Sequence, residues 1–136
     1  MKRVTGIGGI FFKSTDPNTL KNWYKEHLGI DAGDYGATFQ WREADDPTRE
    51  GQTVWAPFPQ TTKYFEPSNA SFMINYRVAD LDGLLSELRA AGVAVDEKTE
   101  SFDYGKFAWI TDPDGNRIEL WEPTETSPEA PSEAES

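Results

Sequence analysis

The chain contains no cysteine and a single histidine, His27, among its 136 residues. The lack of cysteine excludes a disulfide framework, a thiolate nucleophile and a cysteine-ligated metal. A single histidine also argues against most histidine-based metal sites and against the serine–histidine pair of many hydrolases. His27 lies near the C-terminal end of a predicted helix, where a cation is favourable, so we expect a capping or surface role for it rather than catalysis.

Basic residues are scarce, with 13 Lys and Arg against 24 Asp and Glu, and the formal net charge is −11. Nucleic acid is therefore excluded as a partner, because its phosphates require a basic face. After residue 122 the chain holds only Pro, Thr, Ser, Ala and Glu. We expect residues 123–136 to form a disordered acidic tail. The rest of the chain is acidic as well and would suit a cationic ligand.

No apolar run approaches the length of a membrane span, and the N-terminus lacks the apolar core of a signal peptide. We therefore expect a cytoplasmic protein with no membrane partner. At this length the chain forms one domain with a real core. We place that domain at residues 1–122.

The chain repeats itself at an offset of 64 residues. Residues 9–16 align with residues 73–80, so that Ile10 matches Ile74 and Asp16 matches Asp80. A Phe-x-Trp segment at residues 39–41 is echoed at residues 107–109. The pattern is typical of a duplicated supersecondary unit. It predicts one module at about residues 5–62 and a second at about residues 69–122.

Local signals predict the same order of elements in both halves. Asp16 followed by Pro17 begins a helix that Gly29 ends, and Asp80 begins a second helix that ends at Gly92. Runs rich in β-branched and aromatic residues predict strands at residues 5–13, 37–43, 52–58, 71–78, 106–110 and 116–121. A further strand begins at residues 93–95, with a loop or edge at 100–104, and residues 31–36 are a loop or short strand. The last two strands join through a tight turn at residues 112–115. Each half is thus β-α-β-β-β.

This arrangement resembles the vicinal oxygen chelate superfamily, which includes glyoxalase I, bleomycin-resistance proteins and extradiol dioxygenases. The resemblance covers residues 5–122. It depends on the strand–Asp–Pro–helix entry, on Trp23-Tyr24 to Leu28-Gly29, and above all on Asp112-Pro-Asp-Gly-Asn-Arg-Ile-Glu-Leu-Trp121. It implies an α+β fold in which two tandem βαβββ modules form a curved mixed sheet. Helices would cover the convex face, the concave face would form an aromatic cleft, and the protein would be a homodimer.

Metal-dependent members of this family place His or Glu ligands at four duplicated positions. The offset of 64 assigns these positions to Gly9, Trp55, Met73 and Glu119 in this chain. Only Glu119 can ligate a hard divalent ion, because the other three side chains offer no suitable lone pair. A catalytic zinc normally has three protein ligands. We therefore expect no metal and no cofactor, although a divalent metal held by ligands elsewhere stays an alternative.

Strand alternation, helped by the resemblance in the Phe-x-Trp segments, predicts which side chains line the cleft. Most are aromatic or cationic, which is typical of a small-molecule site. The predicted ligand-binding residues are Phe11, Lys13, Phe39, Trp41, Trp55, Met73, Asn75, Arg77, Phe107, Trp109, Arg117 and Trp121. Glu119 is the candidate general acid or base, or else a structural carboxylate paired with Arg77 or Arg117. The aromatic set could instead be ordinary core or dimer interface, but its place opposite the helix face favours the cleft.

Three hypotheses follow. The favoured one is a binding protein of the bleomycin-resistance type that holds a small aromatic or hydrophobic molecule in a metal-free cleft. The second is a divalent-metal enzyme of the glyoxalase or dioxygenase type with ligands not recognised here. The third is a metal-free enzyme in which Glu119 transfers a proton. The fold alone cannot choose among them.

Overall fold

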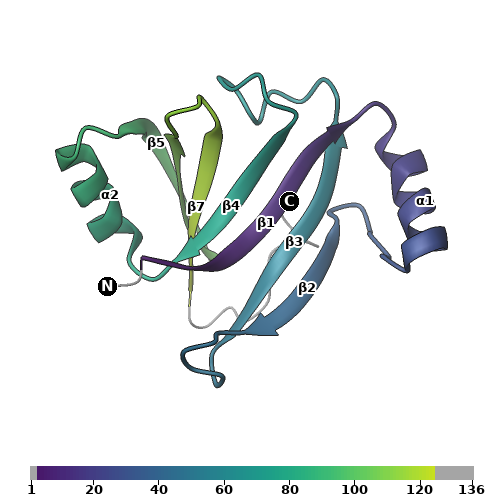
Figure 1. The fold of residues 1–136 in the computed structure, drawn as a ribbon, viewed down its shortest axis with the longest axis horizontal. Coiled ribbons are helices and arrows are strands. Elements are labelled where there is room, and N and C mark those ends of the chain that lie inside the picture. The colour runs from purple at the N-terminus through teal and green to yellow at the C-terminus, as the bar shows by residue number, and fades with distance from the viewer. Residues whose placement is uncertain (1–2, 125–136) are drawn as a thin grey trace.

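The computed structural model describes residues 3–124, and these form a single mixed sheet with two helices (Figure 1). Residues 125–136, most of the predicted tail, lie outside the described part. The elements follow the predicted order: β1 (Val4–Ser14), α1 (Pro17–Leu28), β2 (Ala37–Arg42), β3 (Glu50–Pro59), β4 (Phe72–Val78), α2 (Leu81–Ala90), β5 (Ala94–Phe102), β6 (Gly105–Thr111) and β7 (Arg117–Pro123). No helix in residues 3–124 is long and apolar enough to cross a membrane.

The sheet has the strand order β2-β3-β1-β4-β7-β6-β5. β1 and β4, the first strands of the two halves, run antiparallel at its centre, and each also pairs in parallel with the last strand of its own half. Gly9 faces Asn75 and Phe11 faces Met73 across the central pair, so an offset of 64 relates the two strands by an approximate two-fold axis. The predicted α+β class and the curved mixed sheet are confirmed.

The two helices begin as their sequences predict. The carboxylate of Asp16 accepts a hydrogen bond from the backbone N–H of Thr19, and that of Asp80 accepts one from Gly83, each at 3.1 Å. These bonds satisfy amide groups that the first turn of a helix leaves unpaired. α1 ends at Gly29, whose φ of 72° is the left-handed conformation that glycine adopts freely. Both helices lie against the same face of the sheet, at its two ends (Figure 1).

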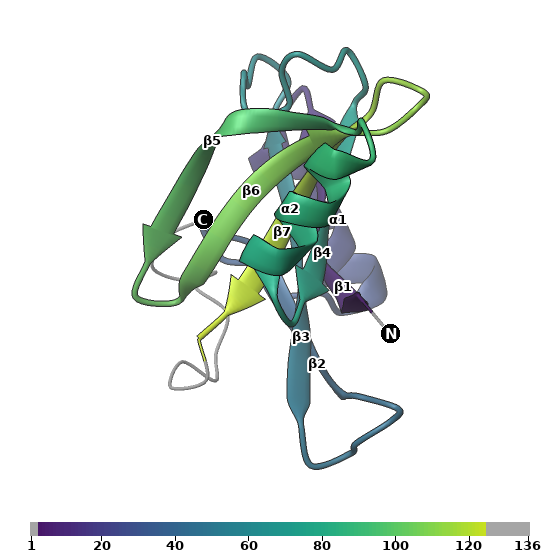
Figure 2. The same cartoon turned by 90° about the vertical axis from the view of Figure 1, so that its left-hand side faces the viewer.

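The halves differ in their number of strands. The second half shows the full βαβββ order, whereas residues 31–36 of the first half form only an isolated bridge between Gly33 and Gly36. This segment is rich in glycine and aspartate, which are poor strand formers. In the second half, β5 runs as one edge strand through residues predicted partly as a loop, with an irregular register between Val95 and Thr99. Figure 2 shows this long strand beside β6.

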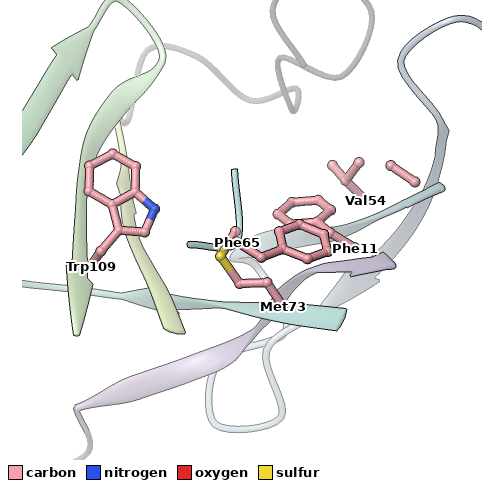
Figure 3. Packing of buried hydrophobic residues seen from close by; sticks show 6 residues of the cluster. Phe11, Val54, Phe65, Met73 and Trp109 are labelled. Atoms are coloured by element: carbon pink, nitrogen blue, oxygen red, sulfur yellow. The ribbon is translucent and has the colours of Figure 1, made fainter. Parts of the chain in front are cut away.

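Apolar side chains fill both faces of the sheet. On the helix side, Leu81, Leu84 and Leu85 of α2 pack against Ala108 and Leu120. On the opposite, concave face a second buried cluster contains Phe11, Val54, Ala56, Phe65, Met73 and Trp109. Phe65 comes from the loop between β3 and β4, and Figure 3 shows its ring against Phe11 and Met73. A loop side chain is thus part of the core on the side where the cleft was expected.

Between the helices the convex face is less well covered. Val4, Ile7 and Ile10 of β1 and Phe72 of β4 are each about two-fifths exposed. Because β1 and β4 are neighbours, these four side chains form an exposed apolar strip at the centre of the sheet.

Candidate functional site

Glu119 lies on β7 at the middle of the concave face and is only 2% exposed. Its carboxylate accepts three hydrogen bonds. The Nδ2 of Asn75 donates to Oε1 at 2.7 Å, the Nε1 of Trp109 donates to Oε2 at 3.1 Å, and the hydroxyl of Tyr64 donates to the same Oε2. The predicted pairing of this carboxylate with Arg77 or Arg117 is wrong: Arg117 instead pairs with Asp96 at 3.1 Å.

Burial raises the pKa of Glu119 above its usual value, although the three donors and the charge of Arg117 act in the opposite direction. Burial and the negative charge of Glu119 likewise raise the pKa of Tyr64. The tyrosine hydroxyl therefore stays protonated and donates a hydrogen bond to the carboxylate. Tyr64 belongs to the loop of residues 60–71 between β3 and β4, and its ring stands at 88° to that of Trp109. Glu119 is thus sealed beneath this loop.

The register of the strands corrects one of the four family metal positions. Asn75 pairs with Glu119 in the second half, whereas its counterpart Phe11 pairs with Ala56, not with Trp55. The offset between β3 and β7 is therefore 63, one residue less than between β1 and β4. Trp55 pairs with Ile10 and packs against Tyr24 of α1 with ring centroids 4.8 Å apart. Its predicted position in the cleft is wrong, because a one-residue shift moves a side chain to the other face.

The corrected positions are Gly9, Ala56, Met73 and Glu119, and they do not fit a metal. Glycine, alanine and a thioether are no ligands for hard divalent ions. Within residues 3–124 there is no group of three His, Cys, Asp or Glu side chains that could hold a metal ion. The single carboxylate already accepts bonds from three protein donors.

The Phe-x-Trp echo does not mark equivalent positions either. Phe107 and Trp109 pair with Trp121 and Glu119, whereas Phe39 and Trp41 pair with Thr53 and Gly51. Phe39 is 47% exposed on the edge strand β2. The similarity of these two segments is therefore local in sequence and has no counterpart in the sheet. The predicted place of Phe39 in the cleft is not supported by its position.

The other predicted lining residues fall into two groups along the concave face. Around Glu119, Phe11, Met73 and Trp109 are buried in the core cluster rather than lining an open cleft. The ammonium of Lys13 lies 5.7 Å from the ring of Phe65, and the guanidinium of Arg117 lies 5.2 Å from that of Trp109. This end of the face, closed by the loop of residues 60–71, is called the closed end below.

The second group surrounds Arg77, at the other end of the same face. Its guanidinium carbon lies 5.4 Å from the ring of Trp41 and 5.6 Å from that of Trp121, which in turn stacks on Phe107. A pocket of about 520 Å³ opens beside it, between the β2–β3 hairpin and the end of β7. Arg77, Trp121 and Gln52 line this pocket. This end is called the open end below.

The sequence prediction missed Tyr64 and Phe65, the two side chains that close the face. They occur between the predicted strands at residues 52–58 and 71–78, in a segment bounded by two proline-containing stretches. Two consecutive aromatic residues in a polar linker are a signal that the segment docks on an apolar surface. Phe65 is fully buried, and Tyr64 stacks on Phe58 at an interplanar angle of 9°.

Several solved structures share this fold. Methylmalonyl-CoA epimerase from Mycobacterium tuberculosis is 22% identical, with a TM-score of 0.61 and 93% of each chain covered. The Streptomyces coelicolor methylmalonyl-CoA epimerase, in its Q60A form with 2-nitronate-propionyl-CoA, is 18% identical with a TM-score of 0.63, covering 89% of this chain and 99% of that one. A superfamily member from Vibrio splendidus 12B01 is 14% identical with a TM-score of 0.54, covering 85% and 97%. At these identities the likeness shows the fold alone.

No curated protein sequence matches the chain. The family comparison is more direct, because it matches residues 7–120, from β1 through most of β7, to the model of one superfamily. That stretch includes nearly all of both halves of the duplication and all of the Asp112–Trp121 motif except its last residue. The chain therefore belongs to the Glyoxalase/Bleomycin resistance protein/Dioxygenase superfamily.

Proposed function

We propose that this protein binds a small aromatic or hydrophobic molecule without a metal, in the manner of the bleomycin-resistance branch of its superfamily. The observation that carries the proposal is the loss of the chelating set. Of the four corrected family positions only Glu119 can ligate, and Tyr64, Asn75 and Trp109 already use its two oxygens. The described part of the concave face thus offers a single, already hydrogen-bonded carboxylate and a set of aromatic side chains, which supports metal-free binding.

The open end supplies what such a binding protein needs. Ligand sites combine apolar walls with a few polar groups that orient the ligand. Here the walls include Trp121, and the polar groups include Arg77 and Gln52. The volume of about 520 Å³ suits a small organic molecule.

The test combines a metal assay with a ligand titration on the same preparation. Elemental analysis should find no stoichiometric Zn, Ni, Mn or Fe. Planar aromatic compounds should quench tryptophan fluorescence saturably, with the same affinity before and after treatment with a chelator. A stoichiometric metal whose removal abolishes binding would overturn the proposal and restore the metal-dependent alternative.

A second candidate is a metal-free enzyme in which Glu119 moves a proton. It is favoured by the raised pKa of this carboxylate, since carboxyl groups with perturbed pKa values occur often at catalytic sites. Substrate would reach Glu119 only if the Tyr64 loop moved aside. Glu119→Gln should then abolish turnover and keep ligand affinity. If the variant retains full turnover, this role is excluded.

A further inference from the structure

The open end holds a cation, Arg77, that has no carboxylate partner within residues 3–124. Among the described residues, Arg77 donates one hydrogen bond, from Nη1 to the carbonyl oxygen of Glu50, at a long 3.4 Å. Its Nε is buried and has no partner. Guanidinium groups present five donors in a planar fork that matches the two oxygens of a carboxylate or phosphate. Most of the donors of Arg77 are therefore unused by residues 3–124.

The carboxylates around the same pocket, in contrast, have partners. Glu43 pairs with Arg49 at 3.6 Å. Glu50 pairs with Arg42 at 3.5 Å. Glu122 accepts a hydrogen bond from the backbone N–H of Leu81 at 2.8 Å. Two of these carboxylates are thus paired with other arginines and the third is bound to a backbone amide, so none of the three is the partner of Arg77.

Neighbouring residues hold the guanidinium of Arg77 in place. Trp41 and Trp121 both lie against Arg77, and their indole N–H groups are fixed by hydrogen bonds to Thr53 at 2.8 Å and to the carbonyl of Tyr104 at 3.2 Å. Gly51 allows the close approach of Trp41 and Arg77, because a Cβ at that position would clash with both. A planar cation between two fixed aromatic rings loses little further freedom when it binds a ligand.

Holding the charge there is costly without an anion. Burial lowers the pKa of Arg77; the negative charge of Glu43 opposes this shift and Arg49 adds to it. A half-buried guanidinium regains favourable interactions when an oxyanion replaces the water it has lost.

We propose that the pocket beside Arg77 binds the carboxylate or phosphate group of an organic ligand whose apolar part lies on Trp121 and the aromatic side chains beyond it. This inference rests on the proposed function and names the ligand class: an organic oxyanion with a hydrophobic body. Arg77 makes the direct contact with the oxyanion, and Gln52 lines the same pocket.

The test follows side-chain N–H signals of ¹⁵N-labelled protein by NMR. The probes are inorganic phosphate, acetate, 1-naphthyl phosphate, 1-naphthoate and the neutral 1-naphthamide. The two naphthyl anions should shift the Arg77 Nε–H signal and the indole signals of Trp41 and Trp121. The indole signal of Trp109, which donates to Glu119 at the closed end, should stay in place. Comparison of the phosphate with the carboxylate decides which oxyanion the pocket prefers.

Two variants and a control complete the experiment. Arg77→Gln should weaken binding of the naphthyl anions by about tenfold or more, as expected for a charged hydrogen bond. Arg77→Lys, which keeps the charge but loses the planar fork, should weaken it less and serves if the glutamine variant does not fold. Arg3→Gln is the control, because that arginine pairs with Glu87 and is outside the pocket.

The outcomes separate this inference from the proposed function. Equal affinity for 1-naphthamide and 1-naphthoate, unchanged by Arg77→Gln, would overturn the oxyanion site and leave metal-free binding intact. Phosphate shifting Arg77 while no aromatic compound binds would support the oxyanion site and contradict the proposed function. If none of the anions shifts the Arg77 Nε–H signal, the inference is overturned.

Discussion

Lys13 and Arg77 occupy equivalent positions in the two halves, yet their surroundings differ completely. At the closed end, the ammonium of Lys13 lies over Phe65, and the loop of residues 60–71 covers the sheet. At the open end, Arg77 lies between Trp41 and Trp121 beside a pocket of about 520 Å³. The scaffold is duplicated, but the loop after β3 fills one end of the concave face. A repeated frame can therefore hold core at one end and an open pocket at the other.

The largest expected effect comes from removing the side chain that fills the closed end. Phe65→Ala should lower the free energy of unfolding by about 3–5 kcal/mol, because a fully buried ring leaves a cavity in the cluster. Urea denaturation followed by tryptophan fluorescence measures the change. Tyr35→Ala, a truncation of a more exposed aromatic residue, is the control and should cost much less. A loss below about 1 kcal/mol would mean that the loop is not part of the core.

The variant Tyr64→Phe tests the hydrogen bond that covers Glu119, through the pH dependence of the free energy of unfolding. The variant loses a donor to a buried carboxylate, so stability at pH 7 should fall by about 1.5–3 kcal/mol. Because the folded-state pKa of Glu119 is raised, the protein loses stability as pH rises from the unfolded value of 4.5 to the folded one. Losing the Tyr64 bond raises that pKa further. The difference between variant and parent should therefore be smaller below pH 4.5 than at pH 7.

Unfolding curves at several pH values check this expectation. Tyr24→Phe is the matched control, since that ring packs on Trp55 on the helix side. A Tyr64→Phe effect that is equal at acidic and neutral pH would show that the hydroxyl does not act on the Glu119 charge.

Gly51→Ala tests the open end. The added Cβ would clash with Trp41 and with Nη1 of Arg77, so the stack should shift and stability should fall by about 1–3 kcal/mol. The indole N–H signal of Trp41 should move with it, while that of Trp109 should not. Gly33→Ala is the control, because nothing lies within 4 Å of the Cβ it would gain. Identical behaviour of the two variants would contradict the close packing around Arg77.

The smallest effect compares the two helix starts. Asp16→Ala and Asp80→Ala each remove a capping carboxylate and should each cost about 1 kcal/mol. Asp16 also accepts a bond from the hydroxyl of Thr19 at 2.8 Å, an interaction that Gly83 cannot supply for Asp80. Thermal unfolding should therefore show a slightly larger loss for Asp16→Ala. A reversed order would indicate that packing of α2, rather than capping, decides the difference.

The elements that could be predicted from the sequence are those set by neighbouring residues. The start of α1 at Asp16-Pro17 and its end at Gly29 depend on one helical turn each. The last hairpin depends on a turn in which the N–H of Gly115 donates to the carbonyl of Asp112 at 3.0 Å. Alternation, together with the family resemblance for Trp109, also predicts Asn75, Glu119 and Trp109 on one face, and the structure brings them into hydrogen-bond contact.

The incorrect predictions concern properties that neighbouring residues in the sequence do not determine. The face on which Trp55 lies depends on the number of residues between β1 and β3, and this differs by one from the second half. The docking of Tyr64 and Phe65 depends on the surface that β1, β3, β4, β6 and β7 together present. Periodicity shows which side chains share a face, but it does not show which loop will cover that face.

The one-residue difference between the two halves has a mutational consequence. β3 carries apolar side chains on both faces, with Val54 and Ala56 on one and Trp55 on the other, so the strand remains buried in either orientation. A single inserted or deleted codon before such a strand exchanges every inward side chain for its neighbour at once. A duplicated cleft can thus replace the lining of one half in one step, and a chelating position can vanish without any substitution of the ligand itself.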